Sequence, residues 1–371
     1  MSQLQVGLVG LPNVGKTTLF NAMTRSEAAV ATYAFSTRER NIGTVQVPDE
    51  RLDRLAEMFQ PKKITPTDVE FVDVAGLVRG ASQGEGLGNQ FLGYLRDADA
   101  LAMVVRCFAA GNVEHVDGDI DPARDVETIN LELAVADLAV VDRRIERSRK
   151  AAKVRDPKIE AELAALERIR ATLNEGAPVR SLAWDEAPPV LRELNFLTGK
   201  PMLYVANVDE AYLAAHGARF TPDEHGAWGV QDAASAEGAP AVVVSAELEA
   251  GLVSLSEEES REYLASLSLT ETGLASVIQA GYSLLHLITF LTAGEPEVRA
   301  WTVRRGAAAP EAAGKIHSDI QRGFIRAEVV SFTDLMAAGS IAAAQARGVW
   351  RLEGRDYVMQ DGDVVHFRFN A

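Results

Sequence analysis

The sequence predicts an α/β chain with a mostly parallel sheet, an inserted α-helical hairpin and a small C-terminal α+β domain. Three observations lead to this prediction. Short apolar runs alternate with helical patterns over the first third of the chain, as a parallel sheet wrapped by helices requires. The apolar period then becomes that of long helices, and after Thr289 short strands alternate with turns. The expected domain boundaries are 1–122 together with 198–284, then 123–197, and 285–371.

The strands expected in the first domain are short apolar runs bounded by polar or glycine-rich segments. Helices are expected after Lys16, after Asp49, which suits an N-cap position, and after Gly88. A further helical stretch over residues 272–287 closes the domain. The expected strands are Val6–Val9, Gly43–Val47, Val69–Val72, Leu101–Val105, Met202–Ala206 and Ala241–Val244.

Two apolar stripes at helical spacing predict an antiparallel helical hairpin within residues 123–197. The segment Arg155-Asp156-Pro157 breaks the chain between them, and basic residues gather there from Arg143 to Lys158. The basic run has two interpretations that the sequence leaves open: a solvated hairpin tip, or a tip that contacts phosphate groups. The stripes are Ile129, Leu133, Ala136 and Val140, then Ile159, Leu163, Leu166 and Leu173.

Short strands and turns predict the separate C-terminal domain. An alanine-rich segment lies among them, and turns are expected at Glu353-Gly354 and over residues 360–363. The expected strands are Val298–Val303, Ile325–Phe332, Asp356–Met359 and Val364–Phe369.

The composition is that of an ordinary globular protein, with 47% hydrophobic and 24% charged residues. Because the net charge is −16, binding of nucleic acid by the whole surface is disfavoured, and no specific DNA partner is expected. Neither a signal peptide nor a membrane span is visible in the sequence. A single cysteine, Cys107, rules out an intramolecular disulfide. These features predict a cytoplasmic protein without a membrane partner.

A phosphate-binding loop stands between the first expected strand and helix. The residues Gly10-Leu11-Pro12-Asn13-Val14-Gly15-Lys16-Thr17 match the pattern G-x-x-x-x-G-K-[ST] in the context that this motif requires. Backbone N–H groups at a helix N-terminus cradle phosphates. Lys16, a catalytic candidate, is expected to reach the β- and γ-phosphates, and Thr17 to ligate Mg²⁺. The residues expected to contact nucleotide are Asn13, Val14, Gly15, Lys16, Thr17 and Thr18.

Two further segments are expected to complete the site for magnesium and the γ-phosphate. Asp73 ends an apolar strand and is expected to hold Mg²⁺, while the N–H of Gly76, a second catalytic candidate, senses the γ-phosphate. The glycine-rich stretch over residues 80–88 suits a segment that orders with nucleotide state. Thr37, between the first helix and second strand, is the expected further Mg²⁺ ligand.

Two strand ends predict the site for the base. Asn207-Val208-Asp209-Glu210 stands where G proteins carry Asn-Lys-x-Asp, and Ser245-Ala246 ends the next strand. Val208 cannot cover the ring as the Lys stem does, and Glu210 is badly placed for the bidentate pair with guanine. Asn207 can pair with the N7 and N6 of adenine. The site therefore favours ATP, with a strand-end turn of no binding role as the alternative.

These motifs together resemble the YchF family of Obg-like ATPases, within the Obg branch of P-loop translation-factor GTPases. The resemblance runs nearly from end to end of the chain. It rests on Gly10–Thr17, Asp73–Gly76, Gly80–Leu92, Asn207–Glu210, Arg299–Thr302, Lys315–His317, Gly323–Ala327 and Gln360–Asp363.

The resemblance implies an Obg-type nucleotide-binding domain, an α-helical, coiled-coil-like insertion in it, and a C-terminal, β-grasp-like TGS domain. It also implies that ATP is hydrolysed in preference to GTP, that Mg²⁺ is required, and that the protein associates with the ribosome. The chain departs from the family in the first switch. Family members usually carry Tyr-Pro-Phe-Cys-Thr there, whereas this segment reads Tyr33-Ala34-Phe35-Ser36-Thr37. Because the proline is missing, the unbound switch is expected to be less ordered.

The catalytic step is expected to be slow, because Leu77 stands where Ras-like proteins carry the glutamine that orients water. His115 is the candidate substitute, since its near-neutral side chain suits water orientation, and a solvent-facing loop histidine is the alternative. Asn13 is a candidate for binding a monovalent cation such as K⁺, with a purely loop-shaping role as its alternative.

Three functions remain open at this point. The first is a slow Mg²⁺-dependent ATPase whose switches gate ribosome binding, and the second is a GTPase of the same architecture. The third is an ATP-gated adaptor for ribosomes or RNA with negligible turnover. Arginines of the C-terminal domain form either a face for ribosomal RNA or ordinary solvated strand edges. They are Arg299, Arg304, Arg305, Arg322 and Arg326. The resemblance, and not the spacing, favours contact with the ribosome, through the large subunit, ribosomal RNA, or both.

Overall fold

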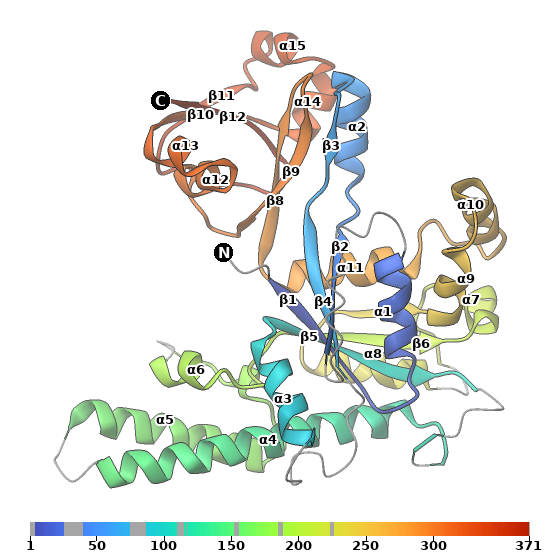
Figure 1. Ribbon diagram of the computed structural model, residues 1–371, viewed down its shortest axis with the longest axis vertical. Helices are drawn as coiled ribbons and strands as arrows, with labels where there is room; N and C mark the ends of the chain where they lie inside the picture. Colours follow the sequence, from blue (N-terminus) through green and yellow to red (C-terminus); the bar gives the residue numbers. More distant parts are fainter. Residues whose placement is uncertain are drawn as a thin grey trace. The chain divides into compact units, whose positions relative to one another are not determined.

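The computed structural model describes residues 4–25, 40–74, 87–109, 115–116, 118–151, 156–184, 188–222 and 226–370 (Figure 1). The chain forms two compact units, of which the first comprises residues 1–45 and 70–281. The second comprises residues 46–69 and 282–371.

The first unit confirms the predicted α/β fold. Its sheet has the strand order β2-β4-β1-β5-β6-β7, and the pairs of β1 with β4 and β5, of β5 with β6 and of β6 with β7 are parallel. Every residue of β5 is buried, as expected of a central parallel strand covered on both faces. The strands are β1 (Gln5–Val9), β2 (Arg40–Gln46), β4 (Asp68–Val74), β5 (Ala100–Cys107), β6 (Met202–Val208) and β7 (Ala241–Val244).

Helices connect these strands, and two of them form the predicted hairpin. In Figure 1, α4 and α5 lie side by side as long antiparallel helices. The helices are α1 (Lys16–Arg25), α3 (Leu87–Asp97), α4 (Pro122–Ala151), α5 (Pro157–Asn174), α6 (Pro189–Leu194), α7 (Glu210–His216), α8 (Ala227–Ala236), α9 (Ala246–Leu252), α10 (Glu257–Ser266) and α11 (Gly273–Leu284), with a short 3₁₀ turn, η1 (Val179–Ser181).

Helix α4 buries different faces along its length. Its first half contacts α8 and β5, and Ile129 and Leu133 are fully buried there. Its second half packs Val141 and Ile145 against Leu166 and neighbouring apolar residues of α5. The predicted stripe through Ile129 and Leu133 therefore faces the sheet domain, and a second stripe forms the hairpin seam.

The second unit is built on another sheet, with strand order β11-β10-β12-β8-β9-β3. The sheet is mixed: the pairs β10–β11, β10–β12 and β8–β9 are antiparallel, and the pairs β8–β12 and β3–β9 are parallel. The strands are β3 (Ile64–Thr65), β8 (Leu287–Ala293), β9 (Val298–Arg304), β10 (Phe324–Ser331), β11 (Arg351–Glu353) and β12 (Asp363–Phe369). The helices are α2 (Glu50–Phe59), α12 (Ala309–Ile316), α13 (Ser318–Arg322), α14 (Phe332–Ala338) and α15 (Ile341–Ala346).

The expected first-domain range 1–122 includes residues 46–69, which belong to the second unit. Helix α2 begins as predicted at an Asp49 N-cap, whose side chain accepts from the N–H of Arg51. Its buried residues Leu52 and Leu55 join an apolar cluster with Leu291 of β8 and other residues of the second sheet. The sequence predicts this helix and its cap, but it does not say which core the helix joins.

One expected C-terminal strand is absent, and the strand β8 was not expected. Residues 356–359 form no strand. The N–H of Met359 donates to the carbonyl of Ala307 and that of Ala309 to the carbonyl of Tyr357, but α12 begins at Ala309, so the pairing cannot continue. This leaves a single bridge between Ala308 and Val358. Conversely, no strand was expected at β8: the helical stretch predicted to run to residue 287 ends at Leu284, and β8 begins at Leu287. Within the described ranges, no helix combines the length and the apolar character that crossing a membrane requires.

Candidate nucleotide-binding site

The phosphate loop follows β1 and leads into α1, and two glycines are required by close approach. A Cβ atom at Gly10 would lie 2.5 Å from the carbonyl oxygen of Val104 in β5. At Gly15, where φ is +94°, it would lie 2.2 Å from Nδ2 of Asn207. Asn13 is exposed and also has positive φ, at 62°. The loop therefore holds its curved shape by residues with left-handed backbone and by contact with two neighbouring strands.

Lys16 lies inside this loop. The residue is only 6% exposed. Its Nζ donates to the carbonyl oxygens of Gly10 at 3.0 Å and Leu11 at 2.9 Å. Burial lowers the pKa of Lys16 to about 8, and the nearby charge of Asp73 partly opposes this shift. The ammonium is thus held by the loop's own oxygens, at the place where phosphate oxygens are expected.

Thr17 and Asp73 meet at the mouth of the loop. Oγ1 of Thr17 donates to Oδ2 of Asp73 at 2.9 Å. The other carboxylate oxygen, Oδ1, is buried and has no hydrogen-bond partner among the described residues. Burial raises the pKa of Asp73, and the bond from Thr17 and the charge of Lys16 oppose this. A hydroxyl and an under-coordinated carboxylate are ligands that Mg²⁺ takes, so these residues fit a magnesium ion.

Asn207 ties the phosphate loop to the loop after β7. Its Nδ2 donates to the carbonyl oxygen of Val14 at 2.8 Å, and its Oδ1 accepts from the N–H of Ala246 at 2.9 Å. The residue is 3% exposed. Since an amide has two N–H donors and two lone pairs on oxygen, one of each remains for a base. Sequence reasoning missed this bracing role, because it depends on groups 193 and 39 residues away.

Of the three residues after Asn207, one is buried, one caps α7 and one is exposed. Val208 is buried, and Asp209 caps α7 by accepting from the N–H of Tyr212 at 2.8 Å. Glu210, the first residue of α7, is exposed, and its Oε1 accepts from the hydroxyl of Tyr263 at 2.6 Å. Both side chains line a cavity of about 250 Å³ that also reaches Ser245. No pattern in the sequence indicates that Tyr263 contacts Glu210.

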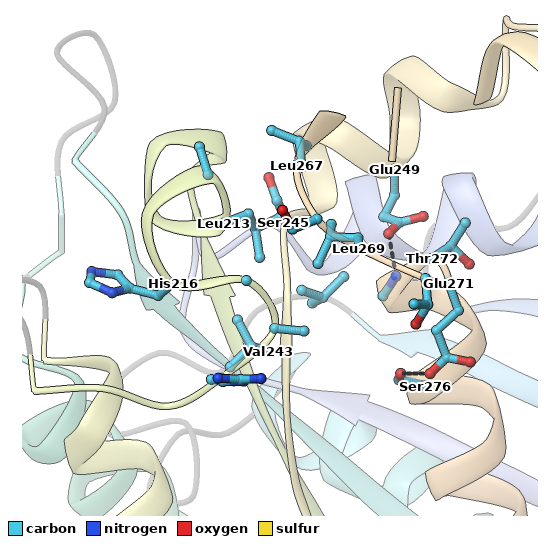
Figure 2. Close-up of a pocket in the computed structure, with 18 of the residues that line it drawn as sticks. Leu213, His216, Val243, Ser245, Glu249, Leu267, Leu269, Glu271, Thr272 and Ser276 are labelled. Carbon is cyan, nitrogen blue, oxygen red and sulfur yellow. Dashed lines mark hydrogen bonds between the residues drawn. The ribbon is translucent and has the colours of Figure 1, made fainter. Parts of the chain in front are cut away.

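Ser245 begins α9 as its N-cap, with its hydroxyl accepting from the N–H of Leu248 at 3.4 Å. It also borders a cavity of about 410 Å³ between α7, β7 and the α10–α11 loop (Figure 2). Glu249, which lines that cavity, is 2% exposed and accepts from the N–H of Gly273 at 2.6 Å. Burial raises the pKa of Glu249 to about 7, against the backbone hydrogen bonds from the start of α11.

His115 is buried, contrary to the solvent-facing alternative. Its Nε2 lies 2.8 Å from Oδ2 of Asp125, in the first turn of α4, and both side chains are 1% exposed. Burial raises the pKa of Asp125, while the hydrogen bond and charge of His115 lower it. The carboxylate therefore fixes the orientation of the imidazole ring.

Three residues named in the sequence analysis are not placed by the structure, and a fourth lies on the surface. Thr37, Gly76 and Leu77 lie outside the described residues, as does most of the glycine-rich stretch. Thr18 is described, and it is exposed in the first turn of α1.

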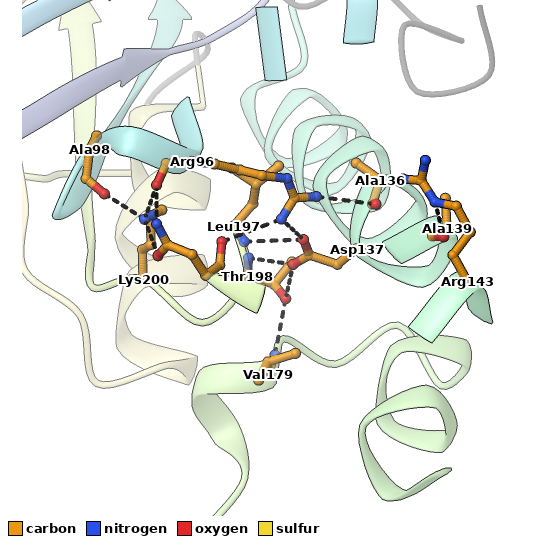
Figure 3. Close-up of polar contacts among 11 residues, drawn as sticks. Arg96, Ala98, Ala136, Asp137, Ala139, Arg143, Val179, Leu197, Thr198 and Lys200 are labelled. Carbon is orange, nitrogen blue, oxygen red and sulfur yellow. Dashed lines mark hydrogen bonds and ion pairs between the residues drawn. The ribbon is translucent and has the colours of Figure 1, made fainter. Parts of the chain in front are cut away.

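The far end of α3 is anchored to the helical insertion by a buried carboxylate (Figure 3). Nη1 of Arg96 donates to Oδ1 of Asp137 at 2.8 Å, and Nη2 donates to the carbonyl of Ala136 at 3.2 Å. Asp137 is 0% exposed and also accepts from the N–H groups of Leu197 at 3.1 Å and Thr198 at 2.8 Å. The hydroxyl of Thr198 adds a further bond at 2.8 Å. Every one of these contacts links segments distant in sequence.

Lys200 caps the same end of α3. Its Nζ donates to the carbonyl oxygens of Arg96 at 2.8 Å and Ala98 at 2.5 Å, and to Oδ1 of Asn195 at 2.8 Å. Burial lowers the pKa of Lys200 to about 8. A cation at a helix C-terminus satisfies carbonyls that have no partner within the helix.

Ion pairs engage Arg144, Arg149 and Lys150 of the basic run at the hairpin tip. Arg144 contacts Glu162 at 2.7 Å and Glu193 at 2.9 Å. Arg149 contacts Glu167 at 2.7 Å, and Lys150 contacts Glu146 at 2.6 Å. Among the described residues of this run, these pairs favour the solvated tip over the phosphate-contacting one.

Comparison with known proteins gives a consistent result. The family model of 50S ribosome-binding GTPases matches residues 5–142, and the YchF-GTPase_C model, described as a protein of unknown function (DUF933), matches residues 287–370. The chain is 49% identical to the ribosome-binding ATPase YchF of Bacillus subtilis, covering 99% of this chain and 100% of the relative. It is 48% identical to the protein of the same name from Escherichia coli O157:H7, over 98% and 99% of the two chains.

A solved structure agrees with these relatives. The YchF GTPase of Schizosaccharomyces pombe is similar with a TM-score of 0.85 and 35% identity, over 99% of this chain and 98% of that one. The chain is therefore similar to these proteins in sequence, and to the solved structure in fold, over nearly its whole length.

Proposed function

Because the chain belongs to the YchF family of ribosome-binding ATPases, we propose that it binds ATP and slowly hydrolyses it to ADP and phosphate. The nucleotide state then governs its association with the ribosome, and the cell compartment is the cytoplasm, where ribosomes work. The observation that carries the proposal is the packing of Lys16 against loop carbonyls beside the Thr17–Asp73 pair.

Binding of the triphosphate uses groups that already stand together. Lys16 exchanges the carbonyl oxygens of Gly10 and Leu11 for phosphate oxygens, which suit an ammonium better because they are charged. α1 begins at Lys16, and the N–H groups and dipole of a helix N-terminus favour anions. In this proposal, Lys16 is the side chain of the loop that changes partners when phosphate binds.

Thr17 and Asp73 are the residues that would hold Mg²⁺, with Thr37 as a further proposed ligand. When bound, Mg²⁺ neutralises charge on the phosphates and stabilises the charge that develops during transfer. A metal ion would also give the buried Oδ1 of Asp73 the partner that it lacks among the described residues, which supports this assignment. A monovalent cation at Asn13 is a separate proposal, and equal turnover rates in K⁺ and Na⁺ would count against it.

The preference for ATP is proposed from the base-contacting residues. Asn207 keeps one N–H and one lone pair for the N7 and N6 of adenine. Val208 is buried and cannot cover the ring. Glu210 already accepts a hydrogen bond from Tyr263, so the bidentate pair with guanine is disfavoured. Guanine donors left without acceptors cost about 1–3 kcal/mol each.

For the chemical step, we retain His115 as the group that orients the attacking water, with Gly76 contacting the γ-phosphate. Asp125 holds the imidazole by its Nε2 atom, which restricts the ring to one orientation. Intrinsic turnover is slow in this proposal, because Leu77 cannot hydrogen-bond water.

The ribosome is the proposed partner, through the large subunit, its RNA, or both. The relatives named above are called ribosome-binding ATPases, and one family model describes 50S ribosome-binding GTPases. Arg304, Arg305 and Arg326 of the second unit are exposed and available to phosphate groups. By contrast, Arg322 forms an ion pair with Asp319, and Cζ of Arg299 lies 4.0 Å from the ring centroid of Trp301.

Calorimetric titration of ATP and GTP with Mg²⁺ tests the base preference. Tighter binding of ATP by about tenfold or more supports the proposal, whereas a preference for GTP favours an Obg-type GTPase. Turnover measured with and without ribosomes tests the cycle. Strong acceleration by ribosomes supports an ATPase cycle, and turnover that stays negligible in both conditions indicates an ATP-gated adaptor.

A further inference from the structure

We propose that Tyr263 is a specificity-determining residue, which favours ATP over GTP by holding the carboxylate of Glu210. The inference rests on the proposed function, because it explains the base preference of that same site. Tyr263 is a positioning residue: it acts through Glu210 and is not proposed to touch the nucleotide.

The pair joins two helices that are far apart in sequence. Glu210 is the first residue of α7, immediately after the cap Asp209, so its backbone is fixed beside the strand end that carries Asn207. Tyr263 lies in α10, which begins at a capping box between Ser256 and Glu259. The Tyr263 hydroxyl and Oε1 of Glu210 are 2.6 Å apart.

The direction of this hydrogen bond matters. The bond to Glu210 raises the pKa of Tyr263, so the phenol keeps its proton and is the donor. The carboxylate is the acceptor, and one of its two oxygens is thereby occupied. A hydrogen bond to an ionised acceptor is shorter and stronger than one between neutral groups.

Guanine is disfavoured by this arrangement. It presents N1–H and the exocyclic amine side by side, and a carboxylate satisfies both only when its two oxygens face the base together. Glu210 must give up or bend its bond to Tyr263 in order to do so. The cavity of about 250 Å³ along α9, which both side chains line, lets the carboxylate stay with Tyr263 without steric conflict.

Adenine is favoured for the complementary reason. Its N1 is an acceptor, so a carboxylate that faced it would place two lone pairs against each other. Because Tyr263 retains the carboxylate on the α10 side, the base meets Asn207 without that repulsion. The tyrosine thus works against guanine and for adenine with a single hydrogen bond.

The test is the ratio of ATP to GTP affinity in full-length Tyr263→Phe, measured by calorimetry with Mg²⁺. We expect GTP binding to tighten and the ratio to fall by about three- to tenfold, the worth of one such bond. Tyr263 is 37% exposed, so loss of its hydroxyl is compatible with a folded protein. A ratio that stays within about twofold of the wild type overturns the inference.

Two controls separate specificity from general damage. Tyr357→Phe removes a similar bond, from a tyrosine hydroxyl to Oδ2 of Asp363 at 2.8 Å in the second compact unit, and should leave the ratio unchanged. In a Glu210→Ala background, Tyr263→Phe should have no further effect on the ratio, because the group it positions is gone. A further fall in that background contradicts the inference.

The same measurements distinguish this inference from the proposed function. If the wild type shows no preference for ATP, both fail. If the wild type prefers ATP and Tyr263→Phe keeps that preference, the proposed function stands and the role of Tyr263 is wrong.

Discussion

Thr17 donates its hydroxyl hydrogen to Oδ2 of Asp73 at 2.9 Å, across 56 residues of sequence. The sheet register explains why they meet. In the parallel pairing of β1 with β4, Leu8 lies opposite Asp73, so Asp73 stands level with the end of the strand that leads into the phosphate loop. Carboxyl ends of parallel strands share one edge of the sheet, where ligands bind in this class of fold.

This pairing predicts how Mg²⁺ affects nucleotide binding. Removing the charge of Asp73 with Asp73→Asn should reduce the gain in ATP affinity that Mg²⁺ gives by about tenfold or more, because a carboxylate ligand is lost. Titration of ATP with Mg²⁺ and with EDTA measures that gain directly. The matched control is Asp142→Asn, on an exposed part of α4, which should behave as the wild type. An undiminished effect of Mg²⁺ in Asp73→Asn would show that Asp73 is not a ligand.

Glu249 predicts a pH dependence of stability. Its folded pKa is raised from 4.5 to about 7 by burial, so the folded state binds a proton more tightly than the unfolded state does. The stability it contributes is present below pH 4.5 and is lost as the pH rises toward 7. For this shift, the free energy of unfolding should fall by about 3 kcal/mol across that window.

Glu249→Gln keeps an acceptor for the N–H of Gly273 but cannot ionise, so its stability should change less between pH 5 and pH 8. Chemical denaturation at both pH values measures the difference. Glu271→Gln, in the same cavity but exposed, is the matched control and should retain the wild-type slope. Parallel pH profiles for the wild type and Glu249→Gln would contradict the prediction.

Sequence reasoning found the elements whose signals are local. The phosphate loop, the Asp49 cap and the buried strands of the first unit are contiguous patterns, and the structure has each of them close to its expected position. It missed groups whose roles depend on distant partners. From the sequence alone, Asp137 is an ordinary acidic residue on a long helix, and Tyr263 is an ordinary aromatic residue on a short one. Their partners lie up to 61 and 53 residues away, and no spacing rule links them.

Asp137 predicts a large loss of stability on truncation. Asp137→Ala should cost about 3–5 kcal/mol, because it leaves Arg96 and two backbone N–H groups without their shared buried acceptor. The free energy of unfolding from urea titration measures the cost. Asp142→Ala, five residues further along α4, removes an exposed carboxylate 3.8 Å from Arg170 and should cost less than about 1 kcal/mol. Equal costs for the two variants would contradict the role of Asp137 as the anchor of α3.

His115 carries the prediction for catalysis. If it orients the attacking water, His115→Ala should lower ATP turnover by at least about tenfold, at the low end of what a positioned acid–base group contributes, while ATP affinity stays within about twofold. Asp125→Asn should lower turnover as well and should change its pH profile, because the carboxylate no longer holds the imidazole at Nε2. His366→Ala, exposed on β12, is the control and should keep wild-type rates. Full turnover by His115→Ala, both alone and with ribosomes, would leave the Asp125–His115 pair as a buried structural bond.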